Sequence, residues 1–328
     1  MNGSILSVSN ELFTSWLYRQ GAIPTDAGRS IDDLLEIYQS CMQRADFDPD
    51  FCLPSEFSSI AFERLGVRGS DLSMFAPKSS WLIPRYYRGS FCYECFCDHI
   101  RSFKLPTMLT EWCSVIQTVC PIHIAPLLDT PGKHSYKLNM AVKIFSYYHS
   151  QSSPVEFPRR SLNPKVVGAL LSVQTFMSSV ESCASNGGND SEWRLIQTIV
   201  RIFLYPRYGI IHSLFPRQSI GADARLFRYN LNLGPLVSSV VRRQLAILLA
   251  GLMLDVLAED ERLAVEEYLQ SFDRRHYFFD SAAGLGRSSN VFTPEHGSQL
   301  LAQLTQLSTK IFSPYLTEFI AGFGGRGR

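Results

Sequence analysis

Two pairs of cysteine and histidine residues, each separated by a two-residue gap, constrain the fold of this chain most strongly. Cys92 and Cys95 form the first pair, and Cys120 and His123 form the second. A two-residue gap lets both side chains of a turn point at one ion, and three thiolates with one imidazole suit tetrahedral zinc. The protein would then fill all four positions, so none remains for an activated water. We therefore predict one structural Zn²⁺ ion; the alternative is that these are ordinary buried cysteines.

Length and composition place the chain among globular proteins. Its 328 residues are enough for two compact domains, and 45% of them are apolar. The first residues lack the basic and apolar regions of a signal peptide, so we expect the eight cysteines to be reduced thiols in the cytoplasm. Cys97 and His99 are close enough in sequence to substitute for a metal ligand.

The chain contains no apolar run long enough to predict a membrane span. The longest, Leu245–Leu254, has about half the length that a bilayer requires, and it predicts a buried core helix.

The net charge of +1 combines acidic ends with a basic middle, over residues 81–250. A protein that held long nucleic acid mainly through phosphates would carry a stronger basic excess. The middle of the chain can contact nucleic acid locally, but the sequence as a whole is not that of a DNA clamp.

Hydrophobic periodicity and breaker residues predict a mainly α protein in three parts. Residues 1–80 form a helical region, with helices at 11–20 and 30–45 and a helix-turn-helix-like unit at 55–76. Residues 81–150 form a small zinc-ribbon segment. Residues 151–328 form a helical domain, with helices near 165–182, 192–204, 235–258, 260–270 and 296–320.

Two groups of basic residues are candidates for contacts with a partner. Arg85, Arg88, Arg101 and Lys104 lie among aromatic residues in the zinc segment, a pattern that suits either a nucleic-acid backbone or a protein interface. The modest basic charge favours the protein interface.

Arg64 and Arg68 lie in the helix-turn-helix-like unit. They would contact DNA if that unit reads a duplex, but its acidic surroundings favour packing or protein contact.

The sequence lacks the motifs that identify common active sites. It contains no H-E-x-x-H, no G-x-x-x-x-G-K-[ST] and no G-x-S-x-G, and the cysteines are not in the order of a zinc deaminase. We therefore expect a protein without catalytic residues.

Separated segments of the chain, in matching order, resemble the TniQ family of transposon target-selection proteins. Glu11–Arg19 resembles the family's opening E-x-x-x-S-W-L-x-R helix. Phe91–Cys95 and Trp112–Leu127 resemble its zinc region, the most specific part. Val241–Leu254 resembles a helix rich in R-R-x-A-L-x-x-A-x-x-L-L.

The chain departs from the family pattern at two places. Tyr93 replaces the usual proline of the first cysteine pair, and Leu128–His134 lacks the second C-x-x-C that many relatives carry.

The resemblance implies a non-catalytic adaptor, often a homodimer, that connects target-site recognition to an AAA+ ATPase and its transposase. In some members the recogniser is their own DNA-binding region; in others it is an RNA-guided CRISPR effector complex of the Cascade type. The charge distribution favours the second arrangement. The alternative is a self-sufficient, zinc-containing protein that binds a specific DNA sequence.

Overall fold

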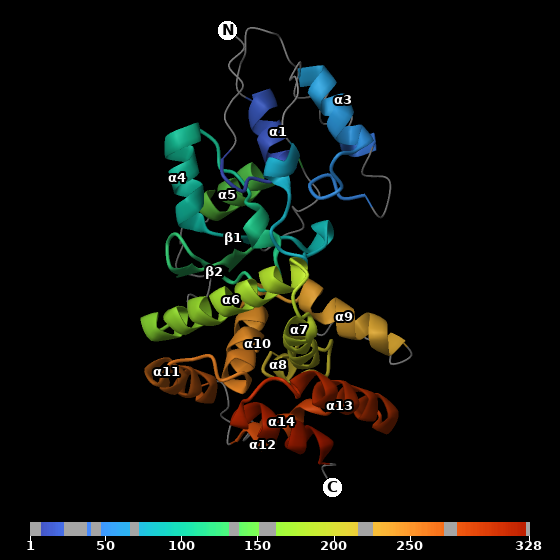
Figure 1. Cartoon of the computed structure of the whole chain (residues 1–328). Coiled ribbons are helices and arrows are strands. Elements are labelled where there is room, and N and C mark those ends of the chain that lie inside the picture. The colour runs from blue at the N-terminus through green and yellow to red at the C-terminus, as the bar shows by residue number, and fades with distance from the viewer. Residues whose placement is uncertain are drawn as a thin grey trace. The chain divides into compact units, whose positions relative to one another are not determined.

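The structure is a computed structural model (Figure 1) that describes residues 8–22, 38–40, 47–65, 72–130, 138–150, 162–215, 226–271 and 281–325. Helices dominate these residues, which confirms the prediction of a mainly α chain. Contacts divide the chain into two compact units. Unit 1 comprises Met1–Ser114 and Leu127–Arg159, and unit 2 comprises Val115–Pro126 and Arg160–Arg328.

Unit 1 is built from short elements around an aromatic core. Its helices are α1 (Phe13–Ala22), α3 (Glu56–Leu65), α4 (Tyr93–Phe103) and α5 (Met140–Ser150), with 3₁₀ turns η1 (Leu72–Phe75), η2 (Arg85–Tyr87) and η3 (Thr110–Cys113). Strand β1 (Ser90–Phe91) pairs antiparallel with β4 (Leu128–Asp129). Phe13 lies near the centre of the core, with its ring 5.3 Å from that of Phe75 and 6.0 Å from that of Phe57.

The second element of the predicted helix-turn-helix-like unit is, in the residues that the structure describes, a 3₁₀ turn. Its first helix is α3, and from residue 72 on the second element is η1, whose Phe75 is buried in the aromatic core. A four-residue 3₁₀ turn spans about 8 Å, too short to reach along a DNA major groove as a recognition helix does. The connecting residues 66–71, and most of the helix predicted at 30–45, lie outside the described residues.

Unit 2 is a helical domain that carries one short hairpin. Its helices are α6 (Pro164–Ser185), α7 (Ser191–Phe203), α8 (Ile210–Ser213), α9 (Phe227–Val237), α10 (Val240–Met253), α11 (Glu259–Gln270), α12 (Ala282–Ser289), α13 (Pro294–Ser308) and α14 (Pro314–Gly324). The hairpin consists of β2 (Val119–Cys120) and β3 (Ala125–Pro126). Helix α10 lies in the core, and Leu245, Ile247 and Leu248 are fully buried.

Helices α6, α13 and α14 of unit 2 start with the same local pattern, in which a polar cap precedes a proline. Asn163, Thr293 and Ser313 each accept a hydrogen bond from a backbone N–H in the first turn, and each is followed by proline. Proline suits the first helical position because its missing N–H would have had no helical partner there. The Ser313–Pro314 step explains why the helix predicted over 296–320 is in fact α13 followed by α14.

Among the described helices, α6 alone is long and apolar enough by itself to cross a membrane, and the bent pair α9–α10 passes the same test together. In unit 2, 44% of the α6 window is buried inside the protein. Core helices of this length and composition also pass such a test, so the absence of a membrane span stays a prediction.

Helices α12 and α14 approach so closely that glycine is required at their contact. A Cβ atom at Gly286 would lie 2.1 Å from the carbonyl oxygen of Phe319, and one at Gly322 would lie 2.0 Å from that of Ala283. Both obstacles are backbone atoms, which cannot move aside without separating the helices.

We expect Gly286→Ala to lower the free energy of unfolding by about 1–3 kcal/mol, the usual cost of overpacking. Gly168→Ala is the matched control, because its Cβ would meet nothing closer than 4.0 Å inside α6. That control should be neutral or stabilising, by up to about 1 kcal/mol. Urea unfolding of both variants measures the difference, and equal stabilities would contradict the close helix contact.

The buried imidazole of His212 makes the stability of unit 2 depend on pH. Its side chain lies in α8 and the residue is 5% exposed. Burial first, and the positive charge of Arg242 second, lower the pKa of His212 to about 4. The folded protein therefore holds this imidazole neutral at pH 7.

We expect stability to fall as the pH drops from about 6.5 towards 4, because the unfolded chain takes up the His212 proton first. The loss attributable to this group is about 3 kcal/mol and levels off below its folded pKa. His212→Gln should remove that part of the slope. Denaturant unfolding of both proteins between pH 4 and 7.5 measures it, and parallel curves would contradict the assignment.

Candidate metal centre

The first pair of predicted ligands lies at the start of α4. Cys92 directly precedes the helix, Cys95 lies in its first turn, and both are buried. The first backbone N–H groups of a helix and its dipole favour negative charge, so this position stabilises thiolates. The Cys92 thiol donates a hydrogen bond to the carboxylate of Glu94, with 3.5 Å between sulfur and oxygen.

The second pair lies on the β2–β3 hairpin. Cys120 ends β2 opposite Ala125, and His123 lies in the four-residue turn between the strands. Ile124 completes that turn with a φ of 47°, an unusual conformation for a β-branched residue. The turn brings the Cys120 sulfur within 3.6 Å of the His123 Nδ1 atom.

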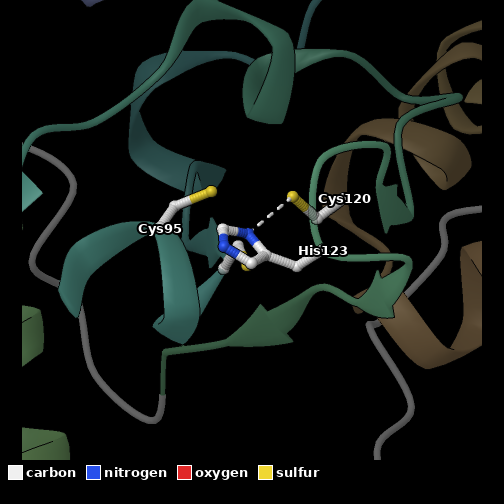
Figure 2. Close-up of side chains that lie close together, drawn as sticks. Cys95, Cys120 and His123 are labelled. Carbon is white, nitrogen blue, oxygen red and sulfur yellow. Dashed lines mark hydrogen bonds between the residues drawn. The ribbon is translucent and has the colours of Figure 1, made fainter. Parts of the chain in front are cut away.

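Figure 2 shows Cys95, Cys120 and His123 directed towards one another. The ligand atoms of Cys92, Cys95, Cys120 and His123 all lie within 4.8 Å of one another. In a tetrahedral zinc site with ordinary bond lengths, a sulfur and a nitrogen ligand lie roughly 3.6 Å apart. The residues therefore fit a single metal ion, and three of the four are buried.

The chemistry of this ligand set is that of a closed site. Three sulfurs and one imidazole are soft ligands that bind zinc and leave no coordination position for a substrate. Three thiolates and a neutral imidazole carry one negative charge more than Zn²⁺ neutralises. The N-terminus of α4 offsets part of that excess.

The two residues considered as substitute ligands, Cys97 and His99, are not part of this group. His99 is buried on α4, and its Nδ1 lies 2.6 Å from the hydroxyl oxygen of Thr107. Within the described residues, no other cluster of at least three potential ligands has this geometry.

Arg85 and Arg88 occupy a different place from the one predicted for partner-contacting residues. Both are buried in ion pairs with Asp50, and Arg88 also pairs with Asp48. The Arg88 Nε donates to the carbonyl of Ile83 at 2.9 Å. We therefore correct the prediction: these arginines hold unit 1 together internally, because their guanidinium groups are enclosed and already paired.

The remaining candidate contact residues are exposed or lie outside the described part. Arg101 is exposed and pairs with Asp98 at 2.7 Å, and Lys104 is exposed at the end of α4. The side chain of Arg64 and the whole of Arg68 lie outside the described residues. Arg101 and Lys104 thus stay candidates for a partner surface.

Sequence reasoning missed the polar residues that hold the segment before Cys120. Gln174 of α6 and Arg243 and Gln244 of α10 bind the backbone of residues 115–119. The unusual concentration of polar residues in Arg242-Arg243-Gln244, at the start of an otherwise apolar helix, was the available signal.

No protein family model, curated protein or solved structure matches this chain. The resemblance to the TniQ family therefore depends on the residues quoted above.

We expect the purified chain to hold one equivalent of zinc, and Cys120→Ala to lose it. Cys183→Ala is the control, because Cys183 is exposed on α6 and lies outside the ligand group. Elemental mass spectrometry of the dialysed proteins measures the metal content. Full zinc content in Cys120→Ala would contradict the assigned ligands.

Proposed function

We propose that this protein is a zinc-stabilised, non-catalytic adaptor in bacterial DNA transposition. It would act in the cytoplasm as a homodimer and link target-site recognition to an AAA+ ATPase and its transposase. The observation that carries the proposal is the group Cys92, Cys95, Cys120 and His123, which joins the most specific TniQ-like segment into one metal-binding geometry.

The closed ligand set supports a structural role for the metal. An adaptor needs rigid surfaces, and metal binding coupled to folding supplies on the order of 10 kcal/mol to a structural zinc segment. The strands in the described residues of this segment, β1 to β4, are two residues long, so hydrogen bonds between strands contribute little rigidity. Zinc would fix the ligand-bearing turns in one arrangement.

We favour an RNA-guided effector complex as the recogniser that this adaptor contacts. The near-zero net charge and the 3₁₀ turn at Leu72–Phe75, the described part of the second element, both suit protein docking better than independent reading of a DNA groove. A protein that reads a sequence by itself would present an element that fits the groove and a surface with a larger basic excess.

We expect the tagged protein, purified from its own host, to retain an AAA+ ATPase and subunits of a CRISPR effector. Cys92→Ser should lose both, because loss of zinc disorders the segment that carries the ligands. Cys183→Ser should keep both, since its side chain is no part of the metal group. Mass spectrometry of the retained proteins is the measurement.

Two results would contradict this proposal. One is a zinc-free Cys92→Ser that retains its partners. The other is a wild-type protein without partners that shifts one short DNA duplex at nanomolar concentration with a steep salt dependence; this result would establish the self-sufficient DNA reader instead.

A further inference from the structure

The segment that leads into Cys120 is buried but has very little β-sheet to pair with. Val115, Thr118 and Val119 are fully buried, and Ile116 is 2% exposed. Strand β2 begins only at Val119, and its partner β3 is two residues long. Backbone N–H and C=O groups buried without partners are costly, so this segment needs hydrogen bonds from elsewhere.

Gln174 of α6 supplies three of these hydrogen bonds. Its Oε1 accepts from the backbone N–H groups of Thr118 at 2.9 Å and of Val119 at 3.1 Å, and its Nε2 donates to the Val119 carbonyl at 3.1 Å. Gln174 is 4% exposed, so water competes little for the hydrogen bonds of its carboxamide. It fixes the two residues immediately before Cys120.

Two neighbouring residues of α10 hold the same segment. The Nε2 of Gln244 donates to the Thr118 carbonyl at 3.1 Å. The Nη1 of Arg243 donates to the carbonyls of Val115 at 3.1 Å and of Gln117 at 3.4 Å, although Arg243 is itself only 1% exposed. A buried arginine is tolerated where carbonyl oxygens receive its N–H groups.

We propose that Gln174, Arg243 and Gln244 are positioning residues of the metal centre. By fixing the backbone of 115–119, they fix where β2 ends and hence where the Cys120 sulfur and the His123 imidazole lie. Partners outside the ligand set typically change metal affinity 10–100-fold, because they orient the ligands before the ion binds. The inference depends on the metal site of the proposed function, and it adds residues that lie more than fifty positions from any ligand.

The contacts join two segments that lie far apart in the sequence. Arg243 and Gln244 belong to the segment Val241–Leu254, and they bind the segment Trp112–Leu127 that carries Cys120 and His123. The polar residues at the start of α10 thus donate hydrogen bonds to backbone carbonyls of the zinc segment. A purely apolar helix could not supply these hydrogen bonds.

The test compares zinc affinity with stability in the full-length protein. Gln174→Met keeps the side-chain volume but removes the carboxamide, and Gln244→Met removes the single hydrogen bond to Thr118. Leu304→Ala is the matched control: it empties a fully buried site on α13 and so destabilises unit 2, but no hydrogen bond joins it to 115–119. Competition with a colour-forming chelator measures zinc affinity, and the visible absorption of the Co²⁺-loaded protein reports the ligand geometry.

We expect Gln174→Met to weaken zinc binding at least 10-fold and to change the Co²⁺ spectrum. Gln244→Met should weaken binding less, and Leu304→Ala should lower the unfolding midpoint while leaving zinc affinity and spectrum unchanged. If Gln174→Met does not fold, Gln244→Met decides, and an affinity within two-fold of wild type overturns the proposal.

Two other results would also overturn it. Wild-type affinity in Gln174→Met would show that the carboxamide does not position the ligands. An equal loss of affinity in Leu304→Ala would show that general stability of unit 2 is responsible. A wild-type protein that binds no metal would contradict the metal site itself and can be told apart from both results.

Discussion

The metal-binding geometry depends on how the buried backbone of residues 115–119 satisfies its hydrogen bonds. Here the side chains of Gln174, Arg243 and Gln244 take the place of neighbouring strands. This arrangement lets a mostly helical unit support a hairpin whose strands are only two residues long.

In unit 1, buried charged residues hold a loop and short elements together. Asp50 is fully buried, accepts the backbone N–H of Thr14, and pairs with Arg85 and Arg88. Removing one partner from such a group leaves an uncompensated charge in the interior. Both units therefore rely on buried polar groups that fix loops and short elements, and helix packing provides the surrounding core.

Local signals in the sequence predicted much of this structure. The spacing of Cys92, Cys95, Cys120 and His123 predicted the ligand group, and apolar periodicity predicted α6, α7 and α11 closely. Partners distant in sequence could not be predicted in this way. The sequence does not show that Asp50 lies beside Arg85 and Arg88, so their position among aromatic residues indicated a surface instead.

The hydrogen bonds between the hairpin segment and α10 also affect how the chain is made. Arg243 lies 128 residues after Val115, whose carbonyl it binds. Ribosomes add about 5–20 residues per second, so on the order of 10 s pass between the appearance of the two. During that time residues 115–119, which include the apolar Val115, Ile116 and Val119, emerge without the side chains that later satisfy their backbone. A nascent chain of this protein is therefore most exposed to misassociation before α10 has been synthesised.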